Sequence, residues 1–224
     1  MIDAKELTSF YNKDGYAPHE LIEGFIHQDF YEKLLESFPS DELFKDEFPT
    51  TRKRNQRPHC RRFMCYHETP QSRYFEPYFV ELAEFTDEWQ ELCDYILHSR
   101  EYRDWVREAL SIKDFHIRLD FHRTAKGLDV SPHVDSNGKY GSHLFYFTPD
   151  GWREEYGGNT VFYKGKKISA MNPEPEDFTQ SLHYPIIGNK SLLFKNVSEG
   201  WHGVKKIDAD GMHRQLFNIV ILKR

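Results

Sequence analysis

The sequence predicts an α+β fold that is mainly β, with a sandwich or jelly-roll core and amphipathic helices packed on one outer face. Two observations carry this prediction. Apolar residues in the N-terminal part recur every three or four positions, which is the period of a helix, whereas those beyond residue 113 recur every second position, as in a strand. Glycine and proline separate the strand-like runs, and such a density of short strands is typical of sandwiches and jelly rolls.

Length and composition favour one domain. The chain has 224 residues, of which 38% are hydrophobic, enough for one substantial core but short for two. We therefore expect a single domain over 1–224, with a mostly helical part at 1–112 and the jelly-roll core at 113–224. The net charge of -6 argues against nucleic acid as a partner, because binding its backbone needs a broad positive field.

The same sequence bears on location. It has no apolar run long enough for a secretory signal or a membrane span, so we expect no membrane association. Its cysteines are only Cys60, Cys65 and Cys93, an odd and sparse set that does not resemble a disulfide framework. A cytoplasmic protein is expected, as a monomer or a homodimer.

Three helices are predicted in the N-terminal part. The segment DFYEKLLESF spaces Phe30, Leu34 and Phe38 four apart, with Asp29 as the expected N-cap. The segment 79–96 keeps three-and-four spacing, and the segment 102–110 repeats it. The arginine-rich stretch 52–62 between these segments is expected to be a solvated loop. An alternative is that it attracts an anionic substrate to the site.

Strands are predicted from residue 114 onward. FHIRLDFHR alternates apolar and polar residues from Phe115 to Arg123. Further strand-like runs lie at 142–148, 159–163, 182–187, 191–195, 201–207 and 214–222.

Two His-x-Asp pairs occur, and they differ in their surroundings. The first, His27 with Asp29, lies at a predicted helix start, where Asp29 has a structural role. The second, His133 with Asp135, ends an extended segment, where residues two apart project from the same face and can converge on one ion. His202 on a late strand supplies a third ligand. Two histidines and one carboxylate leave positions open on a metal, which suits non-haem Fe(II).

The last strand, RQLFNIVIL, begins with Arg214, which shares its face with Leu216 and Asn218 and is expected to point inward. A buried guanidinium is costly unless it meets an anion, and its planar fork matches a carboxylate. A 2-oxo diacid that chelates the metal at one end and contacts Arg214 at the other meets that need.

A family resemblance follows from these motifs in their order. RLDF, SPHVDS, FYFTPDGWREEYGGNTVFY, SLLFKNVSEGWHGV and GMHRQLFNIVIL together resemble the catalytic domain of prolyl-4-hydroxylase-like Fe(II)/2-oxoglutarate-dependent dioxygenases. The resemblance covers roughly residues 115–222. It implies a double-stranded β-helix form of the jelly roll, and hydroxylation of an unactivated C–H bond with O2, releasing succinate and CO2. It leaves open whether ascorbate is also required.

The resemblance also assigns roles to individual residues. It implies that His133, Asp135 and His202 bind the iron, and that Arg214 binds the distal carboxylate of 2-oxoglutarate. Tyr146 stands where such enzymes often place a tyrosine hydroxyl on that carboxylate. Paired glycines, Gly157 and Gly158, match those before a core strand of the family. The chain departs from the family at Phe121-His122, where a tyrosine is common. No direct role is expected for the other histidines of this half, His116, His122, His143, His183 and His213.

The substrate stays open at this point. The family resemblance favours a prolyl residue in a protein, and a free amino acid or another small molecule is the alternative. A non-catalytic module that binds the metal or 2-oxoglutarate as a sensor is the second class of function. Loss of a ligand or of the arginine would favour that class, and neither is lost here.

Overall fold

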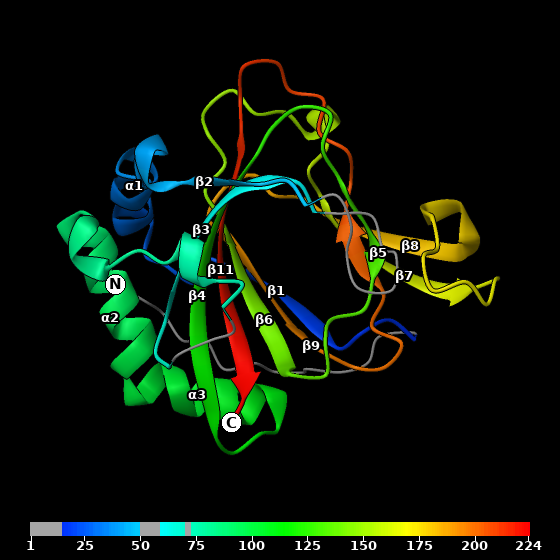
Figure 1. The fold of residues 1–224 in the computed structure, drawn as a ribbon, viewed down its shortest axis with the longest axis horizontal. Coiled ribbons are helices and arrows are strands. Elements are labelled where there is room, and N and C mark those ends of the chain that lie inside the picture. Colours follow the sequence, from blue (N-terminus) through cyan, green and yellow to red (C-terminus); the bar gives the residue numbers. More distant parts are fainter. Residues whose placement is uncertain (1–14, 50–58, 70–72) are drawn as a thin grey trace.

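Two antiparallel sheets form the centre of the fold, with three helices packed on one side (Figure 1). The computed structural model describes residues 15–49, 59–69 and 73–224. Its α-helices are α1 (Gln28–Glu36), α2 (Asp87–His98) and α3 (Arg100–Leu110). The larger sheet contains, in spatial order, β1 (His19–Glu23), β9 (Lys190–Lys195), β6 (Lys139–Tyr146), β11 (Arg214–Lys223), β4 (Phe115–Thr124), β3 (Arg61–His67) and β2 (Lys45–Glu47). The smaller sheet contains β5 (Val130–His133), β10 (His202–Val204), β7 (Thr160–Lys166) and β8 (Phe178–Tyr184).

The larger sheet has two buried faces of different chemistry. On β4, Ile117, Leu119 and Phe121 belong to the hydrophobic core under the helices, together with Trp89 of α2 and Val106 of α3. Successive residues of a strand face opposite sides, so the residues between them project towards the smaller sheet. Those residues are polar: Arg118, Asp120 and His122, all buried. The period-two pattern of this strand therefore separates an apolar helix-facing side from a polar interior.

The interior between the sheets also contains a smaller apolar cluster, which includes Phe162 of β7 and Phe194 of β9. At one edge the sheets are joined directly. His19 of β1 hydrogen-bonds the Tyr184 hydroxyl of β8 at 2.5 Å and stacks on Phe162 at 4.3 Å between ring centroids. The sheets are thus fastened together along the β1 and β8 side, and β5 forms the other end of the smaller sheet.

The predicted fold class is confirmed, since the structure is mainly β with two antiparallel sheets and helices on one outer face. Each predicted strand beyond residue 113 corresponds to an observed one, with ends that differ by a few residues. The structure adds β5, which carries His133. All three cysteines are free. No helix among the described residues is both long enough and apolar enough to cross a bilayer.

Two expectations for the N-terminal part need correction, and the structure adds strands to it: β1, β2 and β3 come from this part and join the larger sheet. The helix predicted from residue 79 begins only at Asp87. Asp29 is not the N-cap of α1: that position is His27, and Asp29 lies in the first turn, where its carboxylate faces the positive end of the helix dipole. The strands β1, β2 and β3 were not predicted because they are short and pair with segments distant in sequence, so their own residues show little periodicity.

The basic stretch 52–62 is partly a strand. Residues 50–58 lie outside the described residues, but Arg61 and Arg62 begin β3. Arg61 forms an ion pair with Glu47 at 2.5 Å, and Arg62 is paired with Asp41. Their charges are therefore largely offset within the fold, which weakens the alternative that these two residues attract an anionic substrate.

Candidate metal centre

Two imidazoles face each other across the smaller sheet. His133 of β5 and His202 of β10 are directly opposed in the strand register, with ring centroids 4.3 Å apart. In each ring Nδ1 contacts a backbone carbonyl two residues upstream, Ser131 at 3.0 Å and Gly200 at 2.9 Å. A carbonyl only accepts, so Nδ1 carries the proton in each ring, and the neutral tautomer of this kind has its lone pair on Nε2. Burial lowers the pKa of His202, which favours the neutral ring that a metal requires.

Asp135 completes the group from the segment after β5. Its Oδ2 is buried without a hydrogen-bond partner and lies 3.9 Å from Nε2 of His202. Lys139 donates to the other oxygen, Oδ1, at 2.7 Å. Burial alone would raise the pKa of Asp135, but the charge of the Lys139 ammonium and its hydrogen bond hold it below its ordinary value. The carboxylate is therefore ionised and has one oxygen free.

These three side chains fit a divalent cation. One ligand atom from each lies within 4.8 Å of the others, and no other group of this kind occurs among the residues the structure describes. A buried carboxylate oxygen without a hydrogen bond is costly, and a cation that accepts its lone pair removes that cost. Three protein ligands leave further coordination positions open, as in sites that bind a chelating co-substrate.

Arg214 lies in the same interior without an anionic partner. It is 3% exposed, and its Nε donates to the Gly158 carbonyl at 2.8 Å. No carboxylate within the described ranges comes within ion-pair distance of it, and burial lowers its pKa. A buried cation of this kind is suited to bind an anion.

Tyr146 and Thr160 stand beside that guanidinium. The hydroxyls of Tyr146 and Thr160 are 2.7 Å apart, and Arg214 Nη2 is 3.5 Å from the Thr160 hydroxyl. The guanidinium carbon lies 5.5 Å from the centroid of the Tyr146 ring. Burial raises the pKa of Tyr146 to about 12, so its hydroxyl keeps its proton and can donate to an anion. The structure thus brings the two predicted anion-binding residues together.

The paired glycines allow the chain to pass close to Arg214. Gly157 and Gly158 have φ of 77° and 75°, a region that other residues rarely adopt. A Cβ on Gly157 would lie 2.1 Å from the carbonyl oxygen of Lys206. A Cβ on Gly158 would lie 3.2 Å from Cδ of Arg214. The backbone conformation therefore favours glycine at both positions, and at Gly157 the space available requires it.

Comparison with known proteins gives a match in structure but not in sequence. No model of a known protein family matches the chain, and no curated protein does so. A prolyl-4-hydroxylase from Pseudomonas putida superposes with a TM-score of 0.56 and 14% identity, over 93% of this chain and 94% of that one. A Phytophthora capsici prolyl 4-hydroxylase gives 0.59 and 16%, over 91% of this chain and 58% of the other.

A third structure is a prolyl hydroxylase from Trichoplax adhaerens, solved in complex with a peptide fragment of the hypoxia inducible factor oxygen degradation domain. It superposes with a TM-score of 0.54 and 13% identity, over 91% of this chain and 83% of that one. The chain has the prolyl-4-hydroxylase fold. The resemblance stated from sequence motifs is confirmed at the level of this fold.

Within the prolyl-4-hydroxylase fold, the structure places further residues at the centre that the sequence did not single out. Lys139 contacts Asp135, and Thr160 joins Tyr146 to Arg214. His59, which precedes β3, has its ring centroid 4.6 Å from that of His133. The only sequence signal for these residues is the alternation of strand residues. It predicts which face of a sheet a side chain lies on, but it does not predict which side chains from other strands lie beside it.

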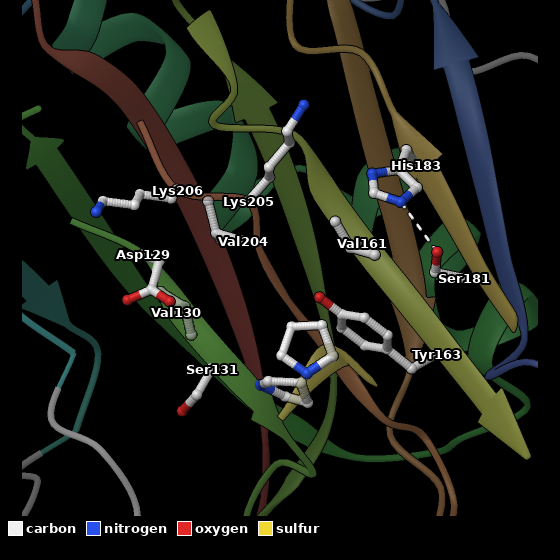
Figure 2. A pocket seen from close by; sticks show the side chains of 12 residues that line it. Asp129, Val130, Ser131, Val161, Tyr163, Ser181, His183, Val204, Lys205 and Lys206 are labelled. Carbon is white, nitrogen blue, oxygen red and sulfur yellow. Dashed lines mark hydrogen bonds between the residues drawn. The ribbon is translucent and has the colours of Figure 1, made fainter. Parts of the chain in front are cut away.

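A separate pocket of about 240 Å³ lies on the outer face of the smaller sheet. Val161 and Tyr163 of β7 line it, and His183 of β8 hydrogen-bonds Ser181 at its wall (Figure 2). The residues that alternate with these on β7 include Thr160, which faces the interior and contacts Tyr146. The strand therefore separates this pocket from the metal centre, and His183 is remote from that centre.

Proposed function

We propose that this protein is an Fe(II)- and 2-oxoglutarate-dependent dioxygenase that hydroxylates an unactivated C–H bond and releases succinate and CO2. One observation carries the proposal. A preformed group of two imidazoles and an ionised carboxylate shares one interior with a buried arginine that lacks an anionic partner among the described residues. A 2-oxo diacid can chelate a metal ion held by the first group with its 2-oxo acid end and bind the arginine with its distal carboxylate.

His133, Asp135 and His202 would hold the iron, which supplies the oxygen-activating chemistry when 2-oxoglutarate and O2 are bound with it. The backbone carbonyls on both Nδ1 atoms fix the imidazole tautomers, and Lys139 fixes the carboxylate by binding the oxygen that the metal does not need. These contacts keep the three ligand atoms in place before any ion arrives, which reduces the entropy lost on binding.

Arg214 would bind the distal carboxylate of 2-oxoglutarate, and Tyr146 and Thr160 would donate hydroxyl hydrogen bonds to it. The hydrogen bond from Nε of Arg214 to Gly158 fixes the plane of the guanidinium, so its remaining N–H groups are oriented in advance. Because the Tyr146 hydroxyl remains protonated through the neutral range, its role as a donor does not change with pH there.

The prime substrate is proposed at the level of class. The peptide complex of the Trichoplax relative supports a prolyl residue within a protein. A free amino acid or another small molecule is the alternative, because the residues of the centre bind the co-substrate and the metal and do not discriminate between these substrates.

The test is an anaerobic titration of the metal-free protein with Fe(II) and 2-oxoglutarate. The expected result for the wild type is the weak visible charge-transfer band of a 2-oxo acid chelated to Fe(II). Asp135→Ala should lose the band, because it removes the carboxylate ligand. Arg214→Met should keep Fe(II) binding but weaken 2-oxoglutarate binding by about 10- to 100-fold, as expected for loss of hydrogen bonds to a charged group.

The other His-x-Asp pair provides a matched control. Asp29→Ala removes a carboxylate from an identical local motif at the start of α1, remote in the fold from β5, and should leave the band unchanged. No band in folded wild-type protein would refute the proposed function. The non-catalytic binding module would then be the better hypothesis, and binding of either ligand alone would test it.

A further inference from the structure

Arg118 and Asp120 form an ion pair in the polar interior, and neither the metal ligands nor Arg214 contacts it. Both residues lie on β4, and they are 7% and 2% exposed. Nε and Nη2 of Arg118 donate to the two carboxylate oxygens of Asp120 at 2.7 Å and 2.8 Å. Because two buried charges are costly to desolvate, a pair of apolar residues would serve stability as well or better. The pair is therefore a candidate for a role in binding.

The geometry of this pair leaves one edge of the guanidinium unused. The edge with Nε and Nη2 faces Asp120, and the ring of Phe75 lies over the guanidinium, with its centroid 4.0 Å from the guanidinium carbon. A guanidinium carries five N–H donors, of which Asp120 accepts two. Nη1 makes no hydrogen bond with any residue that the structure describes. Nη1 and the second N–H of Nη2 therefore form a fork that matches a carboxylate.

An acceptor without a donor lies beside the pair. Asn218 of β11 is directly opposite Asp120 in the strand register and is 8% exposed. Its Oδ1 is buried and has no hydrogen-bond partner within the described ranges. Asp120 also keeps acceptor capacity, since each carboxylate oxygen can accept more than one hydrogen bond. Neighbouring side chains thus present unused donors and unused acceptors, which suits a ligand with groups of both kinds.

The ion pair lies beside the metal centre. On β11, Val220 is opposite Arg118, and Leu222 is the next residue on that face. Leu222 is opposite Lys139 of β6, which binds Asp135. Burial lowers the pKa of Arg118, but its ion-pair partner and, to a smaller extent, the charge of Asp135 raise that pKa above its ordinary value. The guanidinium of Arg118 is therefore within electrostatic reach of Asp135.

The pair is separate from the site proposed for 2-oxoglutarate. Arg214 begins β11, and Asn218 lies four residues further along the same face. At about 3.3 Å per residue, the two are about 13 Å apart along the strand. The interior thus contains two arginines suited to bind ligands, and only Arg214 is assigned to the co-substrate.

We propose that Arg118, Asp120 and Asn218 bind the prime substrate, and that this substrate is a free α-amino acid. Its carboxylate would accept from the unused edge of Arg118, and its ammonium would donate to Oδ1 of Asn218 and to Asp120. The inference rests on the proposed function, because it names the substrate class of the same site.

The charges and the orphaned acceptor favour a free amino acid over a prolyl residue in a protein. Hydrogen bonds in which both groups are charged are stronger than those of neutral amides, so a charged pair discriminates for a zwitterion. A prolyl residue within a chain has no backbone N–H, so it cannot donate to Oδ1 of Asn218. A free amino acid supplies both the carboxylate and the N–H donors.

The test is substrate-dependent turnover of 2-oxoglutarate. Protein loaded with Fe(II) is supplied with 2-oxoglutarate, O2 and each of the standard L-amino acids in turn, and the succinate released is measured. We expect at least one amino acid to raise succinate release above the level without it and to gain one oxygen atom, as detected by mass spectrometry. The N-acetyl amide of that amino acid lacks both charges and should give no increase.

Two variants test the residues. Arg118→Met combined with Asp120→Leu removes both charges, so that neither is left buried alone. It should raise the KM for the amino acid about tenfold to hundredfold, because hydrogen bonds to charged groups are lost, and leave the KM for 2-oxoglutarate unchanged. Asn218→Leu removes the orphaned acceptor and should raise the KM for the amino acid about tenfold.

Arg103→Met is the matched control. Arg103 is also ion-paired, with Glu68 at 3.0 Å, and its guanidinium carbon also lies over a phenylalanine ring, that of Phe115, at 4.6 Å from the centroid. It belongs to α3, outside the interior between the sheets, so both KM values should stay unchanged. An equal rise in the KM for the amino acid would overturn the specific role of Arg118.

The outcomes separate this inference from the proposed function. If the charge-transfer band forms but no amino acid raises succinate release, or only a prolyl peptide does, the inference is overturned and the proposed function stands. Absence of the band would instead count against the proposed function itself. An unchanged KM for the amino acid in the folded double variant would overturn the role of Arg118. If that variant does not fold, an unchanged KM in Asn218→Leu would overturn the proposed binding site.

Discussion

His143 should make the protein sensitive to mild acid. It lies on β6 and is fully buried against the helices, with Phe25 at 4.9 Å and Trp105 at 5.2 Å between ring centroids. Its Nδ1 contacts the Tyr102 hydroxyl at 3.2 Å, whereas Nε2 has no partner. Burial lowers the pKa of His143 to about 3, because the apolar surroundings penalise the charged ring.

The size of the effect follows from the difference between the folded and unfolded pKa. In the unfolded chain the pKa is 6.5, so below that pH the unfolded state binds a proton that the folded state excludes. Stability is therefore retained above pH 6.5 and lost as the pH falls towards 3. At pH 5 the unfolded histidine is about 1.5 units below its pKa, and at about 1.36 kcal/mol per unit the loss is about 2 kcal/mol.

The assay is urea unfolding, followed by tryptophan fluorescence, at pH 7 and pH 5. His143→Leu removes the titrating ring and should lose about 2 kcal/mol less than the wild type between these pH values. The variant starts from a lower stability at pH 7, since the buried Tyr102 hydroxyl loses its partner. His98→Gln, at an exposed histidine, should retain the wild-type pH dependence. An equal loss in His143→Leu and wild type would refute the reasoning.

Two further substitutions test features of the fold. Gly157→Ala should lower the free energy of unfolding, measured with urea or heat, by about 2 kcal/mol more than Gly211→Ala does. Both glycines have positive φ, but only at Gly157 does an added Cβ lie against a backbone carbonyl. Equal losses in the two variants would contradict the steric argument. Tyr184→Phe should lower stability by about 1 kcal/mol, because it removes the hydroxyl that donates to Nε2 of His19 and joins the two sheets. A melting temperature equal to that of the wild type would show that this contact contributes little.

The predictions from sequence succeeded where the signal is local. On β4 and β11 the alternation of apolar and polar residues gave both the strand and its faces, so the inward position of Arg214 could be inferred. His133 and Asp135 are two residues apart, so their convergence follows from the geometry of an extended chain. The convergence of these two side chains could therefore be predicted from sequence, whereas the residues around them could not.

The predictions failed where a distant partner determines the structure. β1 pairs with β9, so that His19 lies opposite Phe194, and neither segment alone specifies that pairing. β3 is a strand because it pairs with β4, although it begins with two arginines that read as a loop. The surroundings of His122 depend on residues from β2, β3 and β11 at once. The predicted N-cap of α1, Asp29, lies two residues after the observed N-cap, His27, a difference within the usual uncertainty of helix ends.

The two sheets are joined at one side only, and the candidate metal ligand His133 lies at the other. His19 and Tyr184 fasten the β1 and β8 side, whereas His133 lies on β5 at the opposite edge, beside His59. The segment 134–138, which follows β5 at this edge, connects two strands, and connecting segments tolerate exchange far better than paired strands do. Laboratory evolution of binding preference could therefore be confined to the positions of that segment other than Asp135, with His133, His202 and Arg214 held constant on their strands.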